Sequence, residues 1–275
     1  MQVINDQKSL KNILNDFKNK NKKISLIPTM GNLHSGHLEL FDRAPSDSIK
    51  VVTIYINPLQ FNDQEDYKNY PRSVKSDIEK CDKKNIDIVY SPHGCITDEI
   101  AFEENIDLPK FTRYLCGSTR DNHFLGVYKI VKHLFSIIQP DFACFGKKDY
   151  QQLLLIKYIA STYFPNLKII DVDIVRENKI PLSSRLYRLN NNSLSRLKLV
   201  YDTLIVIRKD MINGGNFMSI KQNYIREIES NNISVEYLEH RRNDTLEDAS
   251  NYLKNSSLFI AYFVDNIRLI DNIQI

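Results

Sequence analysis

Up to about residue 176, the chain alternates between two hydrophobic patterns. Short, nearly continuous apolar and β-branched runs, typical of strands buried in a parallel sheet, occur at residues 23–27, 49–56, 86–90, 142–145 and 169–175. Between these runs the apolar residues have the spacing of amphipathic helices, which we expect at residues 7–17, 74–81, 123–138 and 153–161. Strands that alternate with helices predict an α/β fold with a Rossmann-like, doubly wound parallel sheet and right-handed crossovers.

After Arg176 the pattern changes. Two helical patterns occur around residues 194–212 and 219–230, and Gly214 and Gly215 mark a turn between them. They are followed by two β-like runs at residues 235–238 and 258–264, and a tail at residues 267–273 closes the chain. We therefore predict two domains, a larger one at residues 1–176 and a smaller α+β domain at residues 177–275.

Composition and charge are those of an ordinary globular protein. Hydrophobic residues make up 42% and charged residues 26% of the 275 residues, so the chain can bury a substantial core. The net charge of +3 is spread over 37 basic and 34 acidic residues, which does not indicate a surface for polyanions. The one basic cluster, residues 18–23, is interpreted as a solvated helix end that leads into the first strand. We therefore expect no nucleic-acid partner.

Cysteine usage and the start of the chain favour a cytoplasmic protein. No C-x-x-C pair occurs among the four cysteines, Cys81, Cys95, Cys116 and Cys144, and no histidine lies at metal-binding spacing from them. This predicts reduced thiols and no metal held by protein ligands. Residues 1–23 are polar and lack the apolar centre of a signal peptide, and no apolar run has the length of a membrane span. We expect no membrane association.

The main candidate for chemistry is the segment PTMGNLHSGH at residues 28–37, which lies between a predicted strand and a new helical pattern. Its two glycines let the backbone approach a ligand, and a helix that starts near Ser35 would point its first N–H groups toward the strand end, where they favour an anion. His34 and His37 would share one face of the first helical turn and suit the charge that builds on a phosphoryl group during transfer. On this motif alone, two surface histidines in an ordinary loop remain an alternative.

Two further segments follow predicted strands in the same way. Residues 146–149, Gly-Lys-Lys-Asp, come after a buried run, and a lysine there can neutralise a polyphosphate as a point charge. Considered alone, this segment could equally be a turn with its charges in solvent. Residues 57–61 follow another strand, at the end where open α/β sheets bind ligands. Asp77 is an isolated carboxylate on a predicted helix; we expect it to be solvated and leave it out of the candidate site.

These segments occur in the order seen in the pantoate–β-alanine ligases (pantothenate synthetases), which the chain resembles from about residue 24 to its C-terminus. The matching segments are PTMG (28–31), HSGH (34–37), NPLQF (57–61), YPR (70–72), HFLGV (123–127), FGKKDYQQ (145–152), SSR (183–185) and RLIDN (268–272). The family belongs to the H-x-G-H nucleotidyltransferase superfamily. The resemblance implies that ATP activates pantoate as an enzyme-bound pantoyl adenylate with release of pyrophosphate, and that β-alanine then gives pantothenate and AMP.

The resemblance also implies the partners of the reaction. Pantoate, β-alanine and ATP would be substrates in the synthesis of a coenzyme A precursor. Mg²⁺ would accompany ATP and be bound mostly through phosphate oxygens rather than by protein ligands. The resemblance further implies a homodimer, with residues 1–176 as the nucleotide-binding domain and residues 177–275 as a lid.

Site residues follow from the resemblance, position by position. His37, as proton donor, His34 and Lys148 would be catalytic. Gln60 and Gln152 would hydrogen-bond pantoate, and Gln60 would also lie near β-alanine. The implied ATP-binding residues are Met30, Gly31, Asn32, Leu33, His34, Ser35, Gly36, His37, Gly146, Lys147, Lys148, Asp149, Val175, Leu182, Ser183, Ser184 and Arg185.

The sequence departs from the family pattern between Arg176 and Ser183, where the usual Asp-Gly turn is missing and the segment is one residue shorter; Leu186 also replaces the usual asparagine. Two alternatives to this function are another H-x-G-H nucleotidyltransferase that acts on a phosphate ester, and a non-catalytic homologue. The neutral amides of Gln60 and Gln152 suit a hydroxy-acid, whereas a phosphate ester would require Arg or Lys. The retained histidines and Lys148 argue against a non-catalytic protein.

Overall fold

The computed structural model describes residues 1–92, 96, 106–249 and 253–275. The chain forms two compact units, each assembled from several stretches. The first unit comprises Met1–Pro109, Arg120–Lys147 and Gln152–Asp173, and the second comprises Lys110–Thr119, Lys148–Gln151 and Ile174–Ile275. Of the cysteines predicted to be reduced, Cys95 lies outside the described residues, and the other three are buried and in no disulfide.

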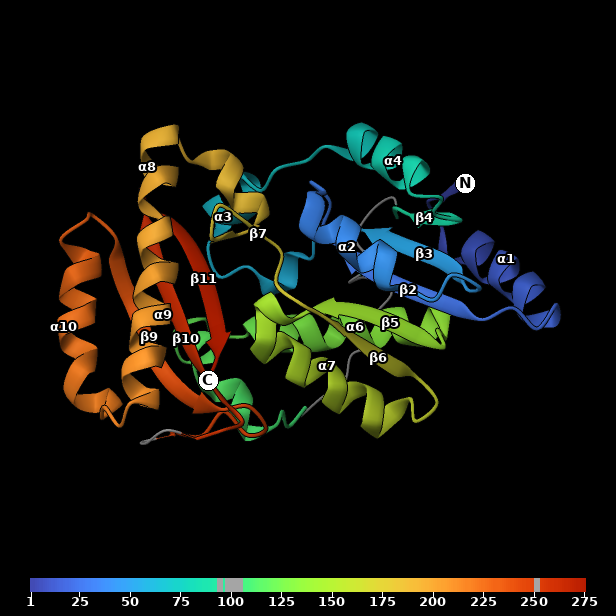
Figure 1. The fold of residues 1–275 in the computed structure, drawn as a ribbon. Helices are drawn as coiled ribbons and strands as arrows, with labels where there is room; N and C mark the ends of the chain where they lie inside the picture. The colour runs from blue at the N-terminus through green and yellow to red at the C-terminus, as the bar shows by residue number, and fades with distance from the viewer. Residues whose placement is uncertain (93–95, 97–105, 250–252) are drawn as a thin grey trace. The chain divides into compact units, whose positions relative to one another are not determined.

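The first unit contains a six-stranded sheet in the order β1-β4-β3-β2-β5-β6 (Figure 1). Its strands are β1 (Gln2–Ile4), β2 (Ile24–Thr29), β3 (Ile49–Ile54), β4 (Ile88–Tyr90), β5 (Phe142–Gly146) and β6 (Lys168–Val172). Neighbouring strands are parallel throughout, which confirms the predicted α/β fold. From β2 the chain proceeds to β3 and β4 on one side and then crosses to β5 and β6 on the other. The direction of winding therefore reverses between β2 and β5, the place where open α/β sheets bind ligands.

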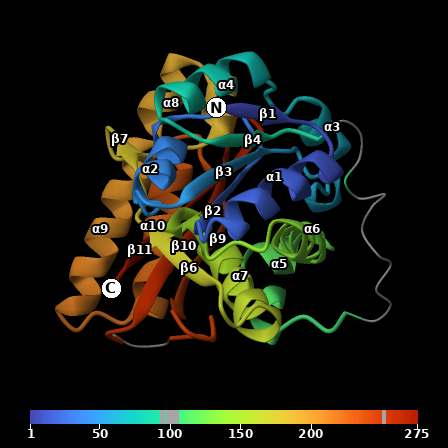
Figure 2. The ribbon, with the colours of Figure 1, turned by 90° about the vertical axis from the view of Figure 1, so that its right-hand side faces the viewer.

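Helices cover both faces of this sheet (Figure 2). The helical segments between its strands are α1 (Gln7–Asn19), α2 (Ser35–Arg43), η1 (Pro58–Gln60), α3 (Gln64–Lys68), α4 (Val74–Lys83) and α6 (His123–Ile138), while η4 (Lys147–Asp149) and α7 (Tyr150–Tyr163) follow β5. On one face, Phe41 of α2 and Cys81 of α4 pack against Ile27, Val52 and Val89 of the strands. Helices α1 and α6 lie on the opposite face and contact each other. Burial from both faces explains the continuous apolar runs of the central strands.

The second unit is built on a three-stranded antiparallel sheet in the order β11-β10-β9. Its strands are β9 (Ser234–Arg242), β10 (Ser256–Val264) and β11 (Ile267–Gln274), and β7 (Arg176–Glu177) and β8 (Ile180–Pro181) form a separate hairpin. Its helices are η3 (Lys110–Arg113), α5 (Cys116–Thr119), η5 (Ser184–Arg188), α8 (Asn191–Arg196), α9 (Lys198–Ile212) and α10 (Phe217–Glu229). This arrangement confirms the predicted smaller α+β part of the fold.

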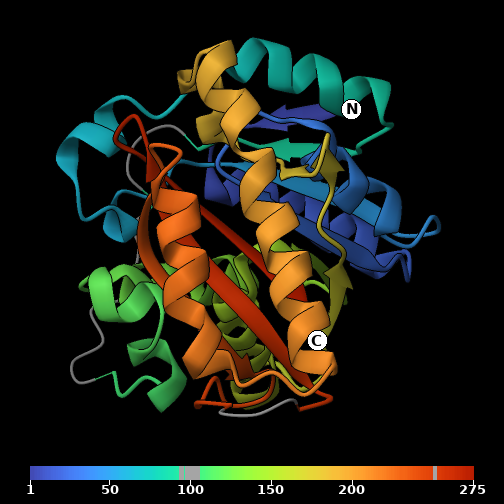
Figure 3. The same ribbon diagram turned by 60° about the vertical axis from the view of Figure 1, so that its left-hand side comes forward.

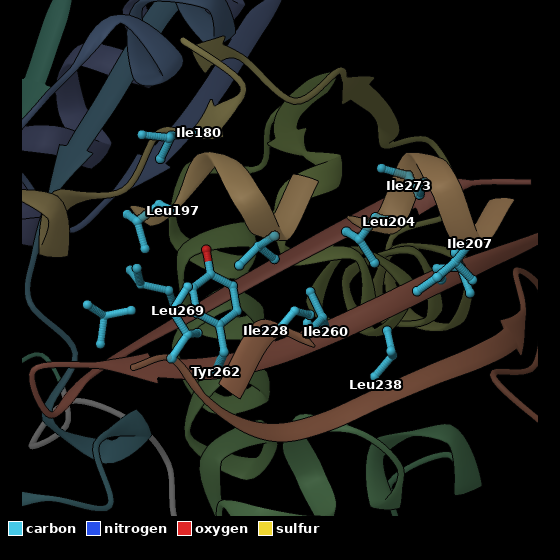
Figure 4. Packing of buried hydrophobic residues seen from close by; sticks show 14 of the residues in the cluster. Ile180, Leu197, Leu204, Ile207, Ile228, Leu238, Ile260, Tyr262, Leu269 and Ile273 are labelled. Carbon is cyan, nitrogen blue, oxygen red and sulfur yellow. The ribbon is translucent and has the colours of Figure 1, made fainter. Parts of the chain in front are cut away.

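The core of the second unit lies between its sheet and two long helices. Helices α9 and α10 pack side by side over the sheet (Figure 3). Leu204 of α9, Ile228 of α10, Leu238 of β9, and Ile260 and Tyr262 of β10 belong to one buried cluster (Figure 4). In the described part of the chain, no helix combines the length and the apolar character needed to cross a membrane.

Candidate active site

The loop after β2 makes a tight turn before α2. Gly31 and Asn32 both have left-handed backbone angles, with φ of +79° and +49°, and His34 is the extended N-cap residue of α2. Helix α2 therefore begins at Ser35, as predicted. Because Gly31 adopts such a φ without strain, the chain can reverse here and bring the first N–H groups of α2 to the carboxyl end of the central strand.

The two histidines of this loop lie together. Their ring centroids are 4.0 Å apart with an angle of 33° between the ring planes, so the rings share one face of the first turn, as predicted. The backbone N–H of His34 donates to Nδ1 of His37 over 3.3 Å. In a neutral imidazole, an accepting Nδ1 leaves the proton on Nε2. The loop therefore favours the tautomer in which His37 is a donor through Nε2.

Asp77 of α4 holds this loop, and the prediction that it is solvated is wrong. Its side chain is buried, and its carboxylate accepts hydrogen bonds of 2.8 Å from the backbone N–H groups of both Asn32 and Leu33. The hydroxyl of Ser73 donates a third, of 3.0 Å. Asp77 precedes the buried Cys81 by four residues, so both lie on the inner face of the helix. The spacing of the apolar residues in α4 does not reveal that a carboxylate is buried on the same face.

Hydrogen bonds fix the orientation of the Gln60 side-chain amide. Asn57 Oδ1 accepts from the backbone N–H of Leu59 over 3.1 Å, so its Nδ2 is the donor group and donates over 3.1 Å to the carbonyl of Gly126 and to Oε1 of Gln60. The Gln60 amide therefore points its Nε2 donors toward Met30, whose sulfur lies 3.0 Å away. A thioether is a weak acceptor, so a ligand with oxygen atoms could replace it as the partner of these donors.

The backbone of Gln60 is also held. Its carbonyl accepts a hydrogen bond of 3.0 Å from Arg120 and lies 2.8 Å from Nδ1 of His123. Helix α6 approaches η1 so closely that a Cβ atom at Gly126 would lie 2.3 Å from the carbonyl oxygen of Leu59. Gly126 thus permits the contact between α6 and the turn that carries Gln60, which gives a steric reason for the glycine of the HFLGV segment.

Gly146 and Lys147 lie at the same edge of the sheet as the histidine loop. Strand β5 pairs in parallel with β2, so the carboxyl ends of both strands lie at one edge. Lys147 Nζ lies 2.6 Å from Asp173 Oδ1, and this hydrogen bond holds the pKa of the Asp173 carboxyl below its usual value. Gln152 is half-buried in the first turns of α7.

The remaining predicted residues belong to the second unit. Asn272 Nδ2 donates over 3.0 Å to the carbonyl of Lys148, and Lys148 Nζ lies 3.6 Å from Asp149 Oδ1. The backbone N–H of Leu182 donates to the carbonyl of Val175 over 3.1 Å.

Residues 183–185 continue from this hydrogen bond into η5. Ser183 is the N-cap of η5 and accepts from the backbone N–H of Arg185, and Ser184 is buried. The first unit thus brings His34 next to His37 and Gln60 next to Met30, and the second brings Leu182 next to Val175. That the residues of both groups bind the same nucleotide stays a prediction.

Comparison with known proteins agrees with this chemistry. A family model described as pantoate-beta-alanine ligase matches residues 2–274. The pantothenate synthetase of Aliivibrio fischeri is 34% identical to the chain, with 100% of the chain and 96% of that protein covered.

Solved structures give the same result. The crystal structure of pantothenate synthetase from Thermus thermophilus matches the chain with a TM-score of 0.87 and 29% sequence identity. The alignment covers 100% of the chain and 99% of the Thermus thermophilus chain. The crystal structure of the pantoate-beta-alanine ligase of Francisella tularensis, complexed with beta-gamma ATP and beta-alanine, matches with a TM-score of 0.83 and 28% sequence identity. This alignment covers 100% of the chain and 97% of the Francisella tularensis chain. The family resemblance found in the sequence is thereby confirmed.

Proposed function

Because the chain belongs to the pantoate–β-alanine ligase family, we propose that it joins pantoate to β-alanine with ATP, and releases AMP and pyrophosphate. The observation that carries this function is the paired His34 and His37 at the start of α2, where the winding of the sheet reverses. The enzyme is an acid–amino-acid ligase, and its product pantothenate is a precursor of coenzyme A.

The reaction needs two displacements. A carboxylate oxygen of pantoate attacks the α-phosphorus of ATP, and the bond from that phosphorus to the pyrophosphate oxygen breaks. The resulting mixed anhydride has a carbonyl carbon that an amine can attack. The amino group of β-alanine then forms the amide bond and loses a proton, and AMP leaves with the electron pair of the broken C–O bond.

The histidine loop supplies donors for the first displacement. Nε2 of His37 and the first N–H groups of α2 would hydrogen-bond the negative oxygens of the triphosphate, where charge increases as pyrophosphate leaves. His34 fixes the His37 ring through its backbone N–H. Because the His37 ring is held before ATP arrives, little reorganisation is needed in the transition state.

The acid is held by neutral amides in this proposal. The Nε2 donors of Gln60 suit the carboxylate and hydroxyl oxygens of pantoate, and Gln152 contributes a second amide. This polarity also favours a hydroxy-acid over the alternative substrate, a phosphate ester, which carries more charge and is usually bound by Arg or Lys. Gln60 would further contact β-alanine.

The second unit completes the nucleotide site in this proposal. Lys148 would give positive charge to the transferring phosphoryl group, and Asp149 would bind the ribose. Residues 182–185 would contact the phosphates, with residues 177–275 acting as a lid. The buried carboxylate of Asp77 already accepts hydrogen bonds from loop N–H groups with both of its oxygens. Because both oxygens of Asp77 are already used, we expect Mg²⁺ to be held mostly through the phosphate oxygens of ATP. We also propose a homodimer in the cytoplasm.

The test is product formation by the purified full-length protein. AMP and pyrophosphate are measured from ATP and pantoate, with and without β-alanine, and with other hydroxy-acids and phosphate esters as comparison substrates. We expect pyrophosphate release that depends on pantoate, and multiple turnovers to pantothenate only when β-alanine is present. Pyrophosphate release that depends on a phosphate ester instead would contradict the proposed substrate.

A further inference from the structure

Residues 31–33 form an unusual turn for a ligand-binding loop. Gly31 and Asn32 both have positive φ, and the backbone N–H groups of Asn32 and Leu33 point toward one anion, as successive N–H groups do in the anion-binding turns of many proteins. Here the anion is internal, since the carboxylate of Asp77 accepts from the N–H groups of Asn32 and Leu33 at 2.8 Å each. These two N–H groups are therefore used to hold the loop in shape and are not available to phosphate. In the proposed function the phosphates are bound by the first N–H groups of α2 and by its histidines.

Lys80 holds the opposite side of the same peptide segment. Its ammonium group donates over 2.7 Å to the carbonyl of Leu33, and it lies one helical turn after Asp77 on α4. The N–H and C=O groups of Leu33 are thus bound by two side chains of opposite charge. Leu33 itself is fully buried and packs in the cluster beneath α2 and α4. Its backbone therefore has very little room to rotate.

The fixed backbone of Leu33 determines where the next residue lies. The N–H of His34 is the group that donates to Nδ1 of His37. A rotation at Leu33 would turn this N–H away from the His37 ring and release the tautomer that keeps the proton on Nε2. A connected series of contacts thus runs from α4 through Leu33 to the donor proposed to act on ATP.

We propose that Asp77 and Lys80 are positioning residues for the ATP-phosphate site, acting through the backbone of Leu33 and His34 without contact with substrate. This inference rests on the proposed function. It predicts that loss of either contact weakens ATP use and the first displacement and leaves pantoate binding unchanged, since Gln60 is held by Asn57, Arg120 and His123 instead.

The contacts of Asp77 and Lys80 with the backbone of residues 32 and 33 are called the clamp below. Conservative substitutions test the clamp while they keep α4 intact. Asp77→Asn has the same shape but replaces one acceptor oxygen with a donor that faces a backbone N–H. Lys80→Met keeps the length of the side chain and removes the ammonium group, whereas Lys80→Arg restores a cationic donor. Asp82→Asn and Lys83→Met are matched controls, because both residues are exposed on the same helix.

Pyrophosphate release is measured with ATP and pantoate varied separately, and each variant's melting temperature is recorded. Misplacement of a catalytic group by about 1 Å can cost on the order of 10²-fold in rate. We expect kcat/KM for ATP to fall about 10- to 100-fold in Asp77→Asn and Lys80→Met, with KM for pantoate within about 2-fold of wild type, partial recovery in Lys80→Arg, and no change in the controls. Equal losses for both substrates, or wild-type ATP kinetics, would overturn the proposal.

A readout without turnover separates this inference from the proposed function. NMR of the full-length protein reports the amide protons of Asn32 and Leu33, which a carboxylate acceptor shifts downfield. We expect both signals to move upfield in Asp77→Asn and stay in place in Asp82→Asn. If wild-type protein makes no adenylate from pantoate, the proposed function fails, yet this shift and weaker binding of a non-hydrolysable ATP analogue still test the clamp. Unchanged amide signals in Asp77→Asn would refute the clamp whatever the substrate.

Discussion

The guanidinium of Arg176 donates two hydrogen bonds of 2.6 Å to the two carboxylate oxygens of Asp271. Asp271 is buried in β11, and Arg176 also donates to the carbonyl of Asn272 and lies over the ring of Tyr201, 4.3 Å from its centroid. Arg176 opens the segment that departs from the family pattern. The ion pair therefore anchors that altered segment to the last strand, beside the Asn272 side chain that binds Lys148.

Arg176→Met should destabilise the protein strongly. Burial raises the pKa of the Asp271 carboxyl and Arg176 opposes that shift, so its loss leaves a buried group without its counter-charge. We expect a decrease of about 3–5 kcal/mol in the free energy of unfolding, measured by urea titration at pH 7. As a control, Lys179→Met breaks the exposed pair with Asp202 and should cost less than about 1 kcal/mol. Similar losses for both variants would contradict this account.

His240 should make stability depend on pH. Burial lowers the pKa of His240 below the value of 6.5 usual for histidine, and its Nε2 lies 2.7 Å from Ser256 Oγ. Below about pH 6.5 the unfolded chain therefore binds a proton that the folded chain rejects, so this contribution is present at neutral pH and declines as the pH falls. Urea titrations from pH 7.5 to 5 should show a shallower decline in His240→Gln. Parallel profiles for both proteins would rule out His240 as the cause.

Much of the fold follows from local sequence patterns. The central strands β2, β3 and β5 and helices such as α6 were predicted because burial of whole faces imposes a periodicity along the chain. The strand β1 and the hairpin of β7 and β8 were missed, since two or three residues carry too little periodicity. Residues 110–119 and 148–151 pack with the second unit, which no local pattern indicates because long-range contacts decide it. The domain boundary at residue 176 stays a prediction.

In the candidate site, too, local features could be predicted from the sequence and long-range contacts could not. A strand, a glycine turn and a helix start predicted the His34 and His37 arrangement, because all three are local features. Asp77 and Lys80 reach the loop from 44 to 47 residues away in the chain, so their role depends on how α4 packs. A polar residue at an inward position of an amphipathic helix was the available signal for Asp77.

Gly126→Ala should displace the turn that carries Gln60. The added Cβ would meet the backbone of Leu59 at 2.3 Å, which forces α6 and η1 apart. We expect a loss of about 1–3 kcal/mol in unfolding free energy, as for other overpacked sites, together with a raised KM for pantoate. Gly146→Ala is the steric control, since nothing lies within 4 Å of its added Cβ, and it should retain wild-type stability. Full stability in Gly126→Ala would refute the steric argument.

Asn57→Asp should reverse the Gln60 amide. The introduced carboxylate cannot donate to Gln60 Oε1, so the amide would turn its Nε2 toward the carboxylate and its oxygen toward the ligand. We expect KM for pantoate to rise about 10-fold or more while KM for ATP stays unchanged, because donors to the acid are lost. Steady-state pyrophosphate release measures both constants. Asn62→Asp, at an exposed position of the same loop, is the control, and an equal rise in that variant would disprove the orientation argument.

His37→Ala and Lys148→Ala should impair the first displacement rather than the second. Each removes a donor or charge directed at the triphosphate in the proposed mechanism, and such losses cost on the order of 10²-fold in rate. Quench-flow measurement of pyrophosphate release from ATP and pantoate, without β-alanine, isolates this step. Gln152→Ala should instead weaken pantoate binding far more than ATP binding, which calorimetry can compare. The exposed Lys168→Ala serves as control. If His37→Ala and Lys148→Ala release pyrophosphate at wild-type rates, the two residues have no place in catalysis.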